Sequence, residues 1–273
     1  MRLSLCISLY NEIHNLPLVI DSTIDWVDEI VVVDGGSTDG TLEALRSKGP
    51  KIRIISVKND PMFHRMKQKA IENAQGDWIL QLDADEQITT ELRNEILGIV
   101  SSKDSETFAY QIPRKNQFLG RFLMKGGVYP DYTIRLYQRG TMYFPWKNLH
   151  ENVEPNQSMK QRARESNWLG KLRHPMNHYS DPNWSRYIAR WHRYCKAEAV
   201  RLKEENVQKQ NWSIKDGILD ILTLLNYIFL LPLYSFLNTY VRHKGFMDGW
   251  QGFVFHFMSA IRWWGIVYYF INR

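Results

Sequence analysis

Cysteine is scarce in this chain, because Cys6 and Cys195 are the only two among 273 residues. Two thiols cannot build a disulfide framework or a four-ligand zinc site, so domains stabilised in either way are excluded. The chain is therefore expected to fold around an apolar core in a reducing compartment. Its 44% hydrophobic and 23% charged residues suit such a core.

The N-terminus lacks a long apolar segment and a small-residue cleavage site. Met1-Arg2 is followed by a short apolar run that leads into Tyr10-Asn11-Glu12. We therefore expect this segment to belong to the fold and not to be a signal peptide. A Gly-x-Gly-x-x-Gly turn is also missing after the run, which excludes a dinucleotide-dependent oxidoreductase.

The formal net charge is +6, and the excess of basic residues is uneven. Between Lys160 and Lys203, lysine and arginine greatly outnumber acidic residues. Such a stretch is typical of a solvated basic face, of a contact with an anionic membrane, or of a site for a phosphate-bearing substrate.

The first hundred residues alternate between two kinds of segment. Short β-branched runs predict strands over 3–9, 29–33, 52–57 and 78–82. Helical spacing of apolar residues predicts helices over 16–26, 41–48, 62–74 and 90–100. This alternation predicts an α/β fold, with a mostly parallel, Rossmann-like sheet flanked by helices.

Acidic residues follow three of the predicted strands. The first strand leads into Glu12, the second ends at Asp34, and the fourth leads into Asp83-Ala84-Asp85-Glu86. Since ligands bind at the carboxyl ends of parallel strands, these side chains are expected to share one edge. Carboxylates gathered there would repel one another without a cation, which indicates a divalent metal or a cationic ligand.

The Asp83-x-Asp85 pair is the strongest candidate for a metal site. It comes directly after the apolar run 78–82 and before a predicted helix. Two carboxylates in this position suit Mg²⁺ or Mn²⁺, which keep several waters and bridge substrate phosphates. The structural alternative is that Asp85 only caps the following helix.

Three segments together resemble family 2 glycosyltransferases of the GT-A fold. They are Ser8-Leu9-Tyr10-Asn11-Glu12, the segment 32–41 around Asp34-Gly35-Gly36, and the segment 76–86 that ends in Asp83-Ala84-Asp85-Glu86. The resemblance implies a catalytic domain over 1–155, with a nucleotide-sugar half over 1–104 and an acceptor half over 105–155. Residues 156–273 would form a basic and helical region. Tyr129-Pro130-Asp131, Arg135-Leu136-Tyr137, His150-Glu151 and 245–249 are most similar to the lipopolysaccharide core β-glucosyltransferase type.

The resemblance also implies roles for single residues. Positions that match the donor-binding segments of the family are Ser8, Tyr10, Glu12, Asp34, Lys67, Asp83 and Arg135. Asp83, Asp85 and Gln87 match the metal positions, and Asp85 would be the more direct ligand. Arg135 would hold phosphate or pair with a structural carboxylate. The chain departs from the family at Gly35, where many relatives have a second acidic residue, and at Lys67-Gln68, where Arg-Asn is usual.

An inverting transfer needs a base that takes the proton of the acceptor hydroxyl. His150-Glu151 matches the acidic position of the family after the metal motif, so Glu151 is the candidate and Asp131 the alternative. The alternative interpretation is that Glu151 is a surface carboxylate without a catalytic role.

Two apolar blocks close the sequence, at 221–241 and 253–271, on either side of Arg242-His243-Lys244. The first block is long enough to span a bilayer but contains Pro232 and several polar residues. Aromatic and basic residues in the second block favour a position in the membrane interface. The second interpretation is that the two blocks form a packed helix pair or a dimer contact. The interpretation that we favour least is a helix that spans the membrane.

These observations together predict an inverting, metal-dependent glycosyltransferase. It would move a hexose, glucose from UDP-glucose, to a lipid-anchored saccharide such as the lipopolysaccharide inner core. Its place would be the cytoplasmic side, peripheral on the anionic inner face of the membrane, and no nucleic acid partner is expected. The alternatives are a capsule, exopolysaccharide or protein-glycan acceptor, and a non-catalytic membrane-associated scaffold.

Overall fold

The computed structural model describes residues 1–60, 63–102, 106–145, 152–165, 167–207 and 225–272. The chain forms two compact units. Unit 1 contains Met1–Arg114 and Asp131–His178, and unit 2 contains Lys115–Pro130 and Tyr179–Arg273. These units divide the chain at other places than the boundary predicted after residue 155.

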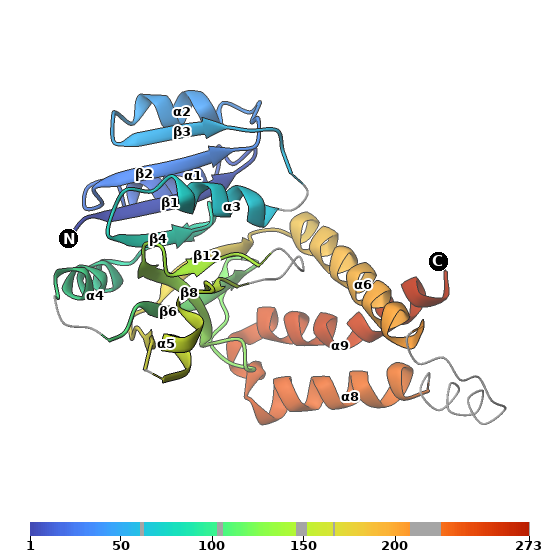
Figure 1. The fold of residues 1–273 in the computed structure, drawn as a ribbon. Coiled ribbons are helices and arrows are strands. Elements are labelled where there is room, and N and C mark those ends of the chain that lie inside the picture. The colour runs from blue at the N-terminus through green and yellow to red at the C-terminus, as the bar shows by residue number, and fades with distance from the viewer. Residues whose placement is uncertain (61–62, 103–105, 146–151, 166, 208–224, 273) are drawn as a thin grey trace. The chain divides into compact units, whose positions relative to one another are not determined.

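Unit 1 is built on a sheet whose strands follow the order β3-β2-β1-β4-β8-β6-β12-β5 (Figure 1). Strands β1 and β2 are parallel, as are β1 and β4, and β2 and β3. Strand β8 runs antiparallel to both β4 and β6. The strands are β1 (Leu3–Leu9), β2 (Glu29–Asp34), β3 (Ile52–Ser56), β4 (Trp78–Leu82), β5 (Glu86–Gln87), β6 (Ala109–Phe118), β8 (Asp131–Gln138) and β12 (Met176–Asp181). Short strands are β7 (Arg121–Phe122), β9 (Met142–Tyr143), β10 (Glu154–Pro155) and β11 (Leu169–Lys171).

Helices cover both faces of this sheet. The helices of unit 1 are α1 (Leu16–Asp21), α2 (Thr41–Ser47), α3 (Phe63–Glu72), α4 (Thr90–Ser101) and α5 (Lys160–Glu165). Alternation along β1 sends Leu5 and Ile7 into the apolar cluster that also holds residues of α1, α2 and α4. Cys6 points to the other face and joins a second cluster with Met66 and Ala70 of α3. The α/β architecture predicted from the first hundred residues is confirmed.

The first helix is shorter than predicted, since it ends at Asp21 instead of residue 26. The Ser22 hydroxyl donates to the Leu18 carbonyl at 2.7 Å, and the Thr23 hydroxyl donates to the Val19 carbonyl at 2.5 Å. Side chains that bond to the preceding turn compete with the helical backbone, which explains the early end.

Unit 2 is mostly helical. It contains α6 (Trp184–Val207), α8 (Leu231–Phe236), the short 3₁₀ helix η3 (Gly245–Asp248) and α9 (Gly249–Ile271). Wide helical turns η1 (Asn226–Leu230) and η2 (Leu237–Arg242) extend α8 at both ends. Helices α6 and α9 meet at Gly265, where an added Cβ would lie 2.6 Å from the Trp191 ring. No helix among the described residues combines the length and the apolar character needed to cross a membrane.

Candidate active site

The loops after β1 and β2 are tied to each other at the carboxyl edge of the sheet. The Asn11 N–H donates to the Ser37 hydroxyl at 2.8 Å, and the Thr38 N–H donates to the Asn11 side-chain oxygen at 2.8 Å. The Glu12 N–H donates to the Thr41 hydroxyl at 3.1 Å. Two of the segments that carry the family resemblance are therefore side by side, as the edge rule for parallel sheets requires.

Asp34 shapes the second of these loops from inside. Its carboxylate is buried and accepts hydrogen bonds from the Gly36 N–H at 2.9 Å, the Ser37 N–H at 3.0 Å and the Ser37 hydroxyl at 2.5 Å. The predicted contact of Asp34 with a nucleotide base stays a prediction. Nearby on β1, the buried Ser8 hydroxyl has no hydrogen-bond partner among the described residues, so it has the capacity to bond a ligand.

Asp83 is held between two cations. Arg135 of β8 donates to Asp83 Oδ2 at 2.7 Å, and Lys67 of α3 forms an ion pair with Asp83 Oδ1. Burial disfavours the charged carboxylate, but Arg135 and Lys67 outweigh burial and hold the pKa of Asp83 well below its ordinary value. Asp83 is therefore ionised at neutral pH, and both of its oxygens have a charged partner.

Arg135 joins Asp83 to the rest of the cluster. Arg135 is 5% exposed, and its guanidinium donates to Glu86 Oε1 at 2.6 Å and to Gln81 Oε1 at 2.5 Å. Burial opposes its charge, but Asp83 and Glu86 raise the pKa of Arg135 above its ordinary value. Arg135 thus pairs with two carboxylates of the cluster, and the predicted contact of Arg135 with phosphate stays a prediction.

Asp131, the alternative base, lies at the start of β8 next to Arg114. Arg114 Nε and Nη2 donate to Asp131 Oδ2 at 3.1 and 2.7 Å, and Arg114 Nη1 lies 3.5 Å from Glu86. Glu151, the preferred base, lies outside the described residues.

Asp85 has a different environment from Asp83. Its Oδ1 lies 3.6 Å from His178 Nε2, because β12 pairs with β5 and sets His178 opposite Glu86. Burial lowers the pKa of His178 below its ordinary value, which favours the neutral imidazole at pH 7. A carboxylate and a neutral imidazole are donors that Mn²⁺ and related divalent ions accept.

Gln87, the third predicted metal position, lies on β5. Its side-chain oxygen accepts a hydrogen bond from Asn177 Nδ2 at 3.1 Å. No group of three or more His, Cys, Asp and Glu side chains in the described part of the chain is arranged to hold a metal ion. The metal site predicted at Asp85 stays a prediction, and a metal there would take further ligands from water and substrate.

Cationic side chains balance several of the carboxylates for which the sequence predicted a metal or a cationic ligand. Lys67, Arg114 and Arg135 pair with three of the carboxylates that meet at the edge, namely Asp83, Glu86 and Asp131. Asp85 instead lies near His178. The sequence indicated the need for a cation, but it did not show that three of the cations are side chains.

Two residues of the cluster, Arg114 and His178, were missed from the sequence, whereas Glu86 was expected at this edge as the end of Asp83-Ala84-Asp85-Glu86. Arg114 and His178 lie far from the motif in the chain and carry no local pattern. The strand pairings β6–β8 and β5–β12 bring them to it.

The remaining donor-binding candidates have separate surroundings. Tyr10 is 41% exposed, and the Glu12 carboxylate accepts a hydrogen bond from Asn15 Nδ2 at 2.6 Å.

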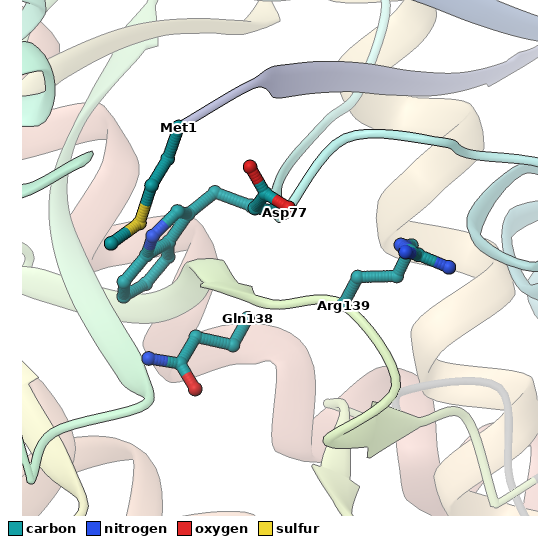
Figure 2. Close-up of a pocket in the computed structure, with 5 residues that line it drawn as sticks. Met1, Asp77, Gln138 and Arg139 are labelled. Atoms are coloured by element: carbon teal, nitrogen blue, oxygen red, sulfur yellow. The ribbon is translucent and has the colours of Figure 1, made fainter. Parts of the chain in front are cut away.

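A surface pocket lined by Met1, Asp77, Trp78, Gln138 and Arg139 lies elsewhere, where β1 and β4 begin (Figure 2). It is at the amino-terminal edge of these strands, so the pocket is not part of the candidate site.

Comparisons with known proteins agree with the geometry. Residues 4–168 match the family model Glycosyl transferase family 2. The chain is 25% identical over 272 residues to the lipopolysaccharide core biosynthesis glycosyltransferase LpsC of Rhizobium meliloti, covering 96% of this chain and 92% of LpsC. It is 24% identical over 258 residues to an uncharacterized glycosyltransferase of Rickettsia bellii, covering 93% and 80% of the two chains.

The fold is similar to that of the mannosyltransferase PcManGT from Pyrobaculum calidifontis, solved in complex with GDP-Man and Mn²⁺. The TM-score is 0.54 at 13% sequence identity, and the match covers 100% of this chain and 88% of that one. The likeness confirms the GT-A fold. The family model matches more than half of this chain, so the chain belongs to glycosyl transferase family 2.

Proposed function

We propose that this glycosyltransferase is inverting and metal-dependent, and that it moves glucose from UDP-glucose to a lipid-anchored saccharide such as the lipopolysaccharide inner core. The observation that carries the proposal is the Asp85–His178 pair beside the ion-paired Asp83, at the carboxyl end of β4. The similarity to LpsC over nearly the whole chain supports the acceptor class.

Asp85 and His178 would hold the divalent ion. When bound, that ion neutralises the negative charge of the diphosphate leaving group, so no general acid is needed. Lys67 and Arg135 hold Asp83 in its ionised, ion-paired form beside the donor site. Ser8 Oγ and the tied loops after β1 and β2 supply polar groups for the nucleoside.

The transfer itself would be a single displacement. The acceptor hydroxyl oxygen attacks the anomeric carbon, its proton passes to a carboxylate, and the bond to the diphosphate breaks with inversion. Glu151 is the proposed base and Asp131 the alternative. Glu151→Gln is expected to keep donor binding and to lose transfer by at least about a hundredfold. The same result with Asp131→Asn, and not with Glu151→Gln, would move the role to Asp131.

The donor is tested by thermal unfolding against UDP, UDP-glucose, UDP-galactose, GDP, GDP-mannose and CMP, each with and without Mn²⁺. GDP-mannose is included because PcManGT was solved with GDP-Man and Mn²⁺. A ligand at a hundred times its Kd adds about 2.7 kcal/mol to the free energy of unfolding, which raises Tm by about 5 °C. We expect a uridine-specific rise that needs Mn²⁺ and that Asp85→Asn abolishes.

A rise in Tm with guanine nucleotides alone would show that the donor carries GDP and not UDP. No response in folded protein would favour the non-catalytic scaffold. The acceptor is then assigned by UDP release with lipopolysaccharide inner core, with capsule or exopolysaccharide fragments, and with glycoprotein.

A further inference from the structure

The turn between the last two helices of unit 2 carries an exposed surface that is both apolar and basic. Phe246 is 50% exposed and Trp250 is 57% exposed. Arg242 and Lys244 precede them in the chain, and Arg121 and Lys125 come from the segment after β6; all four are exposed. These six residues are called the turn surface below.

The turn surface is one rigid piece. The buried carboxylate of Asp248 accepts hydrogen bonds from the N–H groups of Met124 at 3.0 Å and Lys125 at 2.8 Å. The Gly126 N–H donates to the His243 carbonyl at 2.9 Å, and Arg121 Nη2 donates to the Met247 carbonyl at 3.3 Å. These bonds tie the segment that carries Arg121 and Lys125 to the turn that carries Arg242 and Lys244. Asp248 is the only acidic residue in the segments 121–125 and 242–250, and it faces inward.

An apolar stripe continues from the turn surface along both helices. The first arm is the helical segment η1–α8–η2, and the second arm is α9. Leu230, Leu233 and Leu237 are 64%, 59% and 48% exposed on the first arm, and residues 225–241 contain no Asp, Glu, Lys or Arg. Phe253, Phe257 and Trp264 are 45%, 45% and 51% exposed on α9. The ring of Phe253 lies 6.0 Å from that of Phe236 and 5.7 Å from that of Tyr240, so the two arms are joined there.

We propose that the turn surface docks on a bilayer that contains anionic lipids. Phe246 and Trp250 enter the interface, and Arg121, Lys125, Arg242 and Lys244 bind the lipid phosphates. The proposal deepens and rests on the proposed function, since it names the surface through which the enzyme reaches a lipid-anchored acceptor.

Charge decides between the membrane and a second copy of this chain. A twofold contact through the turn surface would bring the cations of one copy against the same cations of the other, which costs energy. An anionic lipid surface provides the opposite charge, and each nearby Lys or Arg then strengthens binding. The apolar stripe is suited to the level of the acyl chains beneath the head groups.

The test is co-sedimentation of the full chain with vesicles of phosphatidylcholine, with and without about one third phosphatidylglycerol. The wild type is expected to bind only the anionic vesicles, and less at about 0.5 M than at about 0.1 M salt. The double variant Arg242→Glu/Lys244→Glu is expected to lower the partition coefficient at least about 25-fold, since each cation contributes about fivefold. Trp250→Ser is expected to lower it about tenfold.

The matched control is Arg46→Glu/Lys69→Glu, which makes the same charge change at exposed positions of α2 and α3. It should bind as the wild type does. Equal binding by the two double variants would overturn the proposal, as would a wild type that ignores anionic vesicles. A dimer that the variant at Arg242 and Lys244 converts to monomer would assign the turn surface to a second copy instead. The Mn²⁺-dependent Tm rise with UDP, measured on the same variants, separates a failure of docking from a failure of the proposed function.

Discussion

Asp83 and Asp85 are two residues apart and have different electrostatic partners. Asp83 pairs with Lys67 and Arg135, whereas Asp85 lies against the neutral imidazole of His178. The first carboxylate balances buried positive charge, and the second has negative charge to offer a cation. The spacing of the motif does not reveal this division, because a two-residue spacing says nothing about which side chains arrive from β8 and β12.

Asparagine at the two positions is expected to separate the roles. Asp83→Asn leaves the buried Arg135 with one carboxylate fewer, so the free energy of unfolding should fall by about 3 kcal/mol. Asp85→Asn removes a carboxylate that lies near the imidazole of His178, and the loss should stay below about 1 kcal/mol while Mn²⁺-dependent UDP binding disappears. Urea unfolding and nucleotide titration of both variants measure these quantities. Equal destabilisation would contradict the division.

His256 is expected to make stability depend on pH. The ring is 1% exposed, and burial lowers its pKa below the ordinary value of 6.5, although the charge of Asp248 acts in the opposite direction. Below pH 6.5 the unfolded chain binds a proton that the folded chain does not, so the free energy of unfolding falls as the pH falls. His256→Gln should reduce this slope by up to about 1.4 kcal/mol per pH unit. Urea unfolding between about pH 5.5 and pH 7.5 tests it, and parallel curves for variant and wild type would refute it.

At the scale of elements, the best-predicted parts are those with regular apolar patterns. The predicted strands 3–9 and 78–82 coincide with β1 and β4, because their side chains alternate between two buried faces. The strand predictions end at residue 82, so they do not include β6 and β8. These two strands span Ala109–Phe118 and Asp131–Gln138 and complete each other's hydrogen bonds, a long-range pairing that no local pattern encodes.

Segment 123–130 of unit 2 depends on close packing against α9. Gly126 has φ +69°, and an added Cβ would overlap the His256 ring, whereas a Cβ on Gly127 at φ +78° would meet nothing within 4 Å. Gly126→Ala should therefore destabilise the protein by about 3 kcal/mol, from strain and overlap together. Gly127→Ala is the matched control, with strain alone and a loss of about 1 kcal/mol. Similar losses in urea unfolding would show that the His256 contact does not limit the segment.

At the scale of the whole molecule, the two proposed ligands belong to different units. The candidate donor site lies in unit 1, and the turn surface lies in unit 2. UDP with Mn²⁺ is expected to slow hydrogen exchange at residues 9–13, 34–41 and 83–87, because binding stabilises the loops that it orders. Anionic vesicles should instead protect residues 241–250. Exchange measured with each ligand in turn tests this, and protection by UDP confined to α8 and α9 would contradict the assignment of the site.

The sequence by itself determined the parallel sheet, the strand ends that carry acidic residues, and the family to which the chain belongs. Local periodicity and motif order carry this information, since they depend on residues close together in the chain. Tertiary structure alone decided which carboxylates are neutralised by Lys67, Arg114 and Arg135, and that His178 meets Asp85. It also decided that Asp248 bonds the backbone of Met124 and Lys125 and so joins two segments of the turn surface. Each of these contacts joins residues more than ten positions apart, and only the pairing of strands and the packing of helices bring such residues together.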